Sequence, residues 1–260
     1  MRRSALATCL IVAAASSAWG QQPLPVPPST IEFLPRYDFL LSAARLENAD
    51  QRFSWDTHWG GNFDLVDYVW GRAMFLADYQ ALLGSEFRPF DPYQGNYTLE
   101  ASGSFRAKGT EAALVLNHVS RHLGDRPKRV AVAMNSLGGR VMRGFSAGSE
   151  TIDLRVDLRR VIAQAYVDYS WVGDADLTWR HAMRGRVGLY GRAHGDLYGV
   201  DKSIAGRDRQ AGGRVELGFR IKGSGGALEL FGGWERMVDA DPLDRLPQQW
   251  GFAGFRVVGR

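Results

Sequence analysis

Four side chains suited to acid–base or nucleophilic chemistry lie close together in the stretch His118-Val119-Ser120-Arg121-His122-Leu123-Gly124-Asp125. A histidine can take the proton of a serine hydroxyl and so make its oxygen a nucleophile. His118 and Ser120 belong to an alternating run that begins at Thr110, so they share one side of a predicted strand. Their Cβ atoms would lie roughly 7 Å apart. The spacing predicts Ser120 as a nucleophile and His118 as its base.

The two faces of the 110–122 run differ in chemistry. Its odd-numbered positions include a glutamate, Asn117 and Arg121, whereas its even-numbered positions are apolar as far as Leu116. Strands of membrane barrels alternate between lipid-facing apolar and interior polar side chains. We therefore expect the odd-numbered side chains to face a barrel interior, and His118 with Ser120 to face lipid.

Three further residues next to the pair, His122, Arg121 and Asn117, are the candidate substrate-binding groups. A metal site is not predicted. His118 and His122 would lie about 13 Å apart along one strand, which is too far to bind a single ion. The sequence also has no glycine-rich phosphate loop, no nucleotide motif and no zinc-ligand spacing. We therefore predict neither a metal nor a cofactor.

The His118–Ser120 pair resembles the His-Ser pair of the outer-membrane lipid A 3-O-deacylases, which are small barrels that cut an ester of lipid A. The resemblance covers these two positions. It implies a lipid A-modifying ester hydrolase that uses His118 and Ser120. That family also has a glutamate that orients the histidine, whereas the first glutamate after Ser120 here is Glu150. Asp125 is the candidate substitute.

A wider resemblance covers roughly residues 36–126. The order of amphipathic strands, the Phe-Asp-Leu at 63–65 and the string at 118–125 are similar to a bacterial outer-membrane family of unknown function. Its string usually reads His-x-Ser-Ser-His-Leu-Gly-Asp-Glu. This chain has Arg121 in place of the second serine and Arg126 in place of the glutamate. The resemblance implies an outer-membrane barrel and no particular reaction.

The start of the chain predicts export. Basic residues, a short apolar run over 5–15 and small residues before a cleavage point indicate a signal peptide at 1–20. Residues 21–35 are rich in proline and read as a periplasmic N-terminal tail, which leaves 36–260 for an outer-membrane β-barrel. The single cysteine, Cys9, lies within the signal, so the mature chain would have no disulfide. We expect the protein in the cell outer membrane of a Gram-negative bacterium.

Alternation of apolar and polar residues dominates the rest of the chain. Within 97–107 one face is apolar and the other carries Glu100 and Arg106, and the pattern recurs over 184–197 and 213–222. Runs of about ten residues with charges on one face are typical of tilted membrane strands. The fold class predicted is all-β, a transmembrane antiparallel up-and-down barrel of about 10–12 strands. Strands are expected at 37–46, 52–59, 70–83, 97–107, 110–122, 129–136 with a possible extension to 145, 151–171, 184–197, 213–222, 227–237 and 250–258.

One expected strand is irregular. Apolar residues occupy even positions over 152–158 and odd positions after Arg159 and Arg160. A single strand over 151–171 needs a bulge there, because a bulge shifts the facing by one residue. Two strands need a turn that the sequence does not mark.

Three functions remain open at this stage. The first is a structural or lipid-contacting barrel, the second is the ester hydrolase described above, and the third is a narrow solute pore lined by arginines. Net charge is +4 over 260 residues, with 32 basic and 28 acidic side chains, so no nucleic-acid surface is predicted. The expected partners are outer-membrane lipids or lipopolysaccharide and the barrel-assembly machinery.

Overall fold

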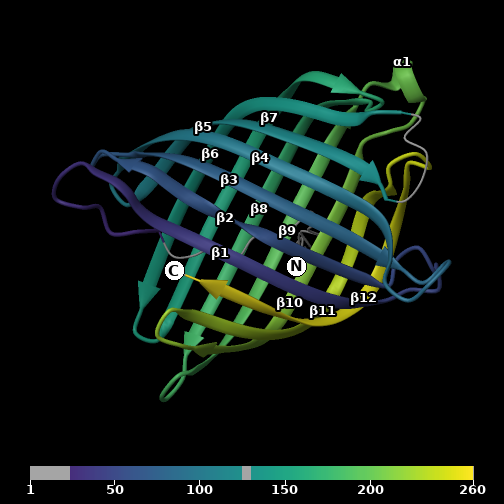
Figure 1. Cartoon of the computed structure of the whole chain (residues 1–260). Helices are drawn as coiled ribbons and strands as arrows, with labels where there is room; N and C mark the ends of the chain where they lie inside the picture. Colours follow the sequence, from purple (N-terminus) through teal and green to yellow (C-terminus); the bar gives the residue numbers. More distant parts are fainter. Residues whose placement is uncertain (1–23, 125–129, 260) are drawn as a thin grey trace, which may run out of the picture.

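A computed structural model of the chain describes residues 24–124 and 130–259. These residues form a closed barrel of twelve antiparallel strands, in which each strand pairs with its neighbours in the sequence and β1 pairs with β12 (Figure 1). The strands are β1 (Glu32–Glu47), β2 (Trp55–Asp67), β3 (Arg72–Gly84), β4 (Asp91–Ala107), β5 (Thr110–Leu123), β6 (Val132–Ala147), β7 (Glu150–Ala165), β8 (Tyr169–Ala182), β9 (Val187–Val200), β10 (Gln210–Lys222), β11 (Gly226–Asp241) and β12 (Leu246–Gly259). A short helix, α1 (Lys202–Ala205), lies between β9 and β10. The predicted fold class is confirmed, at the upper end of its strand range.

The strands cross the barrel wall at a steep angle (Figure 1). A path can be followed from a residue of β1 to its paired residue on β2, and so on around the barrel. It returns to β1 at a residue about 16 positions closer to the C-terminal end of that strand than the one where it began. For twelve strands this offset corresponds to a tilt of roughly 40–45°. Among the described residues, no helix is long and apolar enough to cross a membrane.

Side chains alternate between the interior and the outer surface, as the sequence predicted. On β4, Glu100 and Ser104 are buried in the interior, whereas Leu99 and Phe105 are 41% and 54% exposed on the outside. This arrangement gives the barrel an apolar outer wall and a polar lumen. It is the distribution that a strand in lipid requires.

Several predicted boundaries were wrong. β1 begins at Glu32, so the last four residues of the tail expected at 21–35 belong to the barrel. The strand expected at 52–59 continues as β2 to Asp67, and β4 begins at Asp91, ahead of the expected start at 97. Alternation does not mark where pairing begins, because pairing depends on the neighbouring strand. The signal peptide expected at 1–20 lies outside the described residues.

The irregular segment 151–171 contains both a bulge and a turn. On β6, Ser136 pairs with Val161 while Asn135 pairs with Ala163, so Ile162 is the extra residue of a bulge. The chain then turns at 166–168, where Tyr166 has a positive φ of 57°. β8 therefore occupies a region where only its first residues had been expected to form a strand.

The two ends of the barrel differ in the length of their connections. At one end the strands are joined by short turns at 68–71, 108–109, 148–149, 183–186 and 223–225, and β12 ends there. At the other end the connections include 48–54, 85–90 and 201–209. We call these the short-turn end and the long-loop end. In outer-membrane barrels the short turns are periplasmic and the longer loops extracellular.

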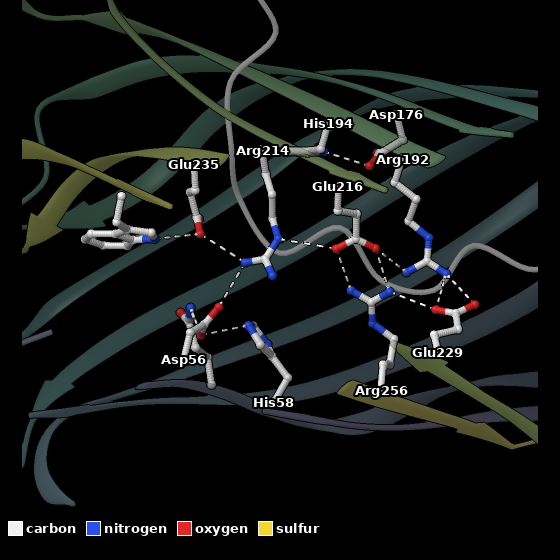
Figure 2. Close-up of polar contacts among 12 residues, drawn as sticks. Asp56, His58, Asp176, Arg192, His194, Arg214, Glu216, Glu229, Glu235 and Arg256 are labelled. Atoms are coloured by element: carbon white, nitrogen blue, oxygen red, sulfur yellow. Dashed lines mark hydrogen bonds and ion pairs between the residues drawn. The ribbon is translucent and has the colours of Figure 1, made fainter. Parts of the chain in front are cut away.

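The lumen is filled by a network of ion pairs. Glu229 accepts hydrogen bonds from Arg192 at 3.0 Å and Arg256 at 2.9 Å, and it also pairs with Arg220. Figure 2 shows that Glu216 lies between the same arginines and Arg214, and that Arg214 in turn reaches Asp56 and Glu235. Because the charges of this network have partners of opposite sign, they can be buried in the interior at lower cost than isolated charges. Glu216, Glu229 and Glu235 thus pair with Arg192, Arg214 and Arg220, three of the arginines in the alternating stretches 184–197 and 213–222.

Two arginines tie connections together at the long-loop end. Arg207, in the β9–β10 connection, donates to Asp168 and to Asp239 at 2.7 Å. Arg52, in the β1–β2 connection, donates to Asp241 at 2.8 Å. Each pair joins segments that are far apart in the sequence. The mouth of the barrel is thus held by ion pairs between connections.

Candidate active site on the lipid-facing wall

The outer face of β5 carries the three polar residues that the sequence placed there. His118, Ser120 and His122 project outward, following Leu114 and Leu116, which are 64% and 48% exposed. β5 runs toward the long-loop end, so the polar residues occupy its last third at that end. The predicted assignment of faces on this strand is confirmed.

A residue that the sequence analysis did not single out completes the arrangement. Asn135 lies on β6 directly opposite His118, because the β5–β6 register pairs these two positions. The His118 Nδ1 lies 2.6 Å from the Asn135 Oδ1. An amide oxygen only accepts hydrogen bonds, so the Nδ1 carries the proton. In the neutral ring this tautomer leaves Nε2 without a proton, which is the form that a general base requires.

Ser120 lies two residues farther along the same face of β5. Its Cβ is roughly 7 Å from that of His118 by the rise of a strand, which is within the reach of an imidazole. A serine, a histidine and a residue that fixes the histidine tautomer form the arrangement of serine hydrolases, and an asparagine fills the third place in some related enzymes. Ser120, His118 and Asn135 are therefore a candidate catalytic triad.

Aromatic rings lie beside this triad on the outer wall. Tyr97 of β4 is paired with Ser120, and its ring centroid is 5.5 Å from that of His122. The row continues through Tyr79 at 4.9 Å from Tyr97, and then Trp59 at 5.8 Å from Tyr79. Because the strands are tilted, this row descends about 3 Å per strand away from Ser120. Tyr97 is therefore the ring of the row nearest in depth to the triad, and aromatic side chains are typical of the boundary between hydrocarbon and head groups.

Two of the predicted substrate-binding residues do not reach this site. Asn117 is buried in the lumen and donates to Glu100 at 3.4 Å, and Arg121 donates inward to the carbonyl of Ala240 at 3.2 Å. Both lie on the opposite side of the wall from Ser120, because the strand alternates. His122 remains on the outer face. Asp125, predicted to orient the histidine, lies outside the described residues, and Asn135 makes the contact expected of it.

Among the described residues, the remaining histidines contact carboxylates but do not have a serine at one ring nitrogen and an orienting group at the other. His58 and His194 are buried in the lumen, where their Nδ1 atoms lie 3.0 Å from Asp78 and 2.7 Å from Asp176. His181, at the short-turn end, contacts both Glu150 and Ser149 through the same Nδ1. A relay needs one ring nitrogen for the serine and the other for the carboxylate. His181 therefore lacks the arrangement that His118 has.

No metal site is evident in the part of the chain that the structure describes. Over residues 24–124 and 130–259, no group of three or more histidine, cysteine, aspartate or glutamate side chains is arranged to hold a metal ion.

Comparison with solved structures shows likeness to outer-membrane β-barrels. Outer membrane phospholipase A from Escherichia coli superposes with a TM-score of 0.53 at 12% identity, over 88% of this chain and 98% of that one. The phospholipase from Salmonella typhi, a dimer with bound calcium, has a TM-score of 0.51 at 13% identity, over 90% and 93% of the two chains. An active-site mutant of the E. coli protein, in which an asparagine is replaced by alanine, has a TM-score of 0.51 at 12% identity, over 94% and 95%. At these identities the likeness establishes the fold, which is that of outer-membrane barrels.

No family model matches the chain, and no curated protein matches it by sequence.

Proposed function

We propose that this protein is a serine hydrolase of the bacterial outer membrane that cleaves an acyl ester of a membrane lipid. The hydrogen bond between His118 and Asn135, beside Ser120 on the lipid-facing wall, carries the proposal. Lipid-contacting residues have no need of a fixed histidine tautomer, whereas a general base does. The contact therefore favours the hydrolase over the purely structural barrel.

The chemistry follows from the positions of the three residues. His118 Nε2 takes the hydroxyl proton of Ser120 as the serine oxygen attacks the ester carbonyl. The tetrahedral intermediate then collapses, the C–O bond to the leaving alcohol breaks, and His118 returns the proton to that alcohol. Water, deprotonated by the same nitrogen, releases the fatty acid from Ser120. Asn135 holds the ring and its tautomer throughout.

The setting suits a substrate that arrives from the lipid side. The triad is on the outer wall near the long-loop end, which by the rule for outer-membrane barrels is extracellular. An ester in the lipid leaflet on that side would lie close to Ser120 without leaving the membrane. The similar structures support this reading, because they include a phospholipase, one of them mutated at an active-site asparagine. Phospholipids and the lipid A of lipopolysaccharide are both candidate substrates.

The solute pore has less support. Paired arginine and carboxylate side chains fill the middle of the lumen, and the interior cavity on the long-loop side is about 160 Å³. An ion-permeable channel needs a continuous aqueous path. We expect the purified protein to be silent in planar-bilayer conductance measurements. Export by the signal at 1–20 and insertion by the barrel-assembly machinery remain part of the proposal.

Fatty-acid release by the purified protein tests the hydrolase. The protein in detergent micelles would be given phosphatidylglycerol or purified lipid A, and free fatty acid measured by mass spectrometry. We expect release by the wild type and a loss of at least about 1000-fold in Ser120→Ala and His118→Ala, because the nucleophile and base act as a unit. Ser146→Ala, which changes an exposed serine near the short-turn end, is the matched control and should retain full activity.

A fluorophosphonate probe gives an independent measurement of the nucleophile. The wild type should be labelled at Ser120, and Ser120→Ala should not be labelled. Circular dichroism would establish that each variant is folded. A wild type that releases no fatty acid from either lipid and takes up no probe would overturn the hydrolase and leave the structural, lipid-contacting barrel.

A further inference from the structure

One arginine lies on the lipid-facing wall close to the candidate triad. Arg160 of β7 is exposed on the outer face, and it pairs with Leu137 on β6 and with Trp171 on β8. Residues on this face below it, such as Leu158, are apolar. A cation on the lipid side of a barrel is unfavourable in hydrocarbon and tolerated near the head groups.

Its depth follows from the register and the tilt of the strands. His118 pairs with Asn135, and Asn135 with Ala163, so Arg160 lies about two strand positions below that row. Because the strands are inclined, each step from a strand to the next in sequence climbs about 3 Å toward the long-loop end. The climb over the two steps from β5 to β7 therefore roughly cancels the two strand positions by which Arg160 lies below the row. Arg160 is therefore within about 3 Å of the depth of His118 and roughly 12 Å from it along the wall.

Arg160 differs from the comparable arginines of the wall in having no partner among the residues that the structure describes. Arg45 and Arg236 also point outward near the long-loop end, but they donate to the carbonyls of Ser54 at 2.9 Å and Ala211 at 3.1 Å. For Arg160 no hydrogen bond or ion pair joins its guanidinium to another residue within 24–124 or 130–259. A long cationic side chain in this position turns toward the polar region of the lipid. Its charge is thus available to a group outside the protein.

We propose that Arg160 binds the phosphate group of the lipid whose ester reaches Ser120, and so makes the hydrolase selective for phosphorylated acyl lipids. This inference rests on the proposed function. A guanidinium matches a phosphate through two parallel hydrogen bonds, which gives both strength and orientation. Register and strand spacing put its Cα about 8 Å from that of Asn135, so the long Arg160 side chain can reach the phosphate of a lipid whose ester lies at the triad. The phosphate can come from a phosphoglyceride or from lipid A.

Substrate preference is the first test. Hydrolysis of phosphatidylglycerol, purified lipid A and uncharged diacylglycerol would be compared in mixed micelles for the wild type, Arg160→Gln and Arg236→Gln. We expect Arg160→Gln to lower the ratio of kcat/KM for a phosphorylated lipid to that for diacylglycerol by about tenfold. The lipid for which the ratio falls identifies the source of the phosphate. Arg236→Gln, at a similar depth but four strands farther around the barrel on β11, should leave the ratio unchanged.

Binding without turnover separates this inference from the proposed function. In a Ser120→Ala background, retention of phosphatidylglycerol or lipid A would be measured by native mass spectrometry, with and without Arg160→Gln. We expect the second substitution to lower retention about tenfold in low salt, and less in high salt because salt screens the charge. Equal retention, or an unchanged substrate ratio, would overturn the role of Arg160. Retention that depends on Arg160 in a protein with no hydrolytic activity would leave it as a lipid-binding residue and reject the hydrolase alone.

Discussion

His118 and Asn135 face each other across two neighbouring strands, and the histidine Nδ1 lies 2.6 Å from the asparagine Oδ1. The contact is outside the barrel, on the wall that faces lipid. It holds the ring and assigns the proton of the neutral imidazole to Nδ1. A histidine held this way is prepared to act as a base before any substrate arrives.

Changing Asn135 should impair the reaction without preventing binding. We expect Asn135→Ala to lower kcat by roughly 10- to 100-fold and to change KM little, because the group acts on the histidine and not on the lipid. Asn135→Asp keeps an acceptor at the same place and should recover part of the loss. Steady-state rates with micellar lipid esters provide the measurement. A kcat for Asn135→Ala equal to that of the wild type would exclude Asn135 from the site.

The lumen network should contribute strongly to stability. Glu229 neutralises Arg192, Arg220 and Arg256, so Glu229→Gln leaves three buried cations sharing fewer carboxylates. We expect the free energy of unfolding to fall by about 3–5 kcal/mol. Urea unfolding in lipid vesicles would measure the change. Glu47→Gln, at the exposed end of β1, is the control and should change stability by less than about 0.5 kcal/mol. Similar losses for both variants would contradict a special role for the network.

The ion pair between Arg207 and Asp168 should make the mouth of the barrel sensitive to acid. Burial alone would raise the pKa of the Asp168 carboxyl, but the Arg207 guanidinium outweighs it and holds the pKa below the ordinary value of 3.8. A lowered pKa means that the pair stabilises the folded connection above that ordinary value and ceases to do so as the pH falls through the lowered one.

Limited proteolysis of the 201–209 connection measures this effect. Proteases active at each pH would be used, and the rate normalised to that of an unfolded substrate. For the wild type, the normalised cleavage should increase only as the pH falls below about 4. Arg207→Gln removes the pair, so its normalised cleavage should already be fast at neutral pH and should change less with acid. The idea fails if the two proteins are cleaved alike at every pH.

Loop lengths predict which end of the barrel faces the outside of the cell. A cysteine introduced at Glu86, in the 85–90 connection, should react with a membrane-impermeant maleimide on intact cells. A cysteine at Ser149, in the turn between β6 and β7, should react only after the cells are broken. Background is low, because Cys9 is the only cysteine in the sequence. The opposite labelling pattern would place the triad at the periplasmic side.

The sequence by itself determined the class of fold and the face of each strand near the site. Alternation is a local property, so Leu116 and His118 could be assigned to lipid and Asn117 to the interior without knowledge of neighbouring strands. The change of phase after Arg159 and Arg160 likewise revealed a bulge. The His118–Ser120 spacing marked a candidate base and nucleophile, because both residues lie on one strand.

Only the tertiary structure decided which residues meet across strands. Asn135 is separated from His118 by a connection, and the register that places them together depends on the pairing of β5 with β6. The depth of Arg160 depends on the offset around the whole barrel, which no single strand encodes. The turn at 166–168 was missed because Tyr166 is not a residue type that marks a positive φ. Local patterns thus marked the candidate residues, and the pairing of strands in the barrel decided which residues lie beside them.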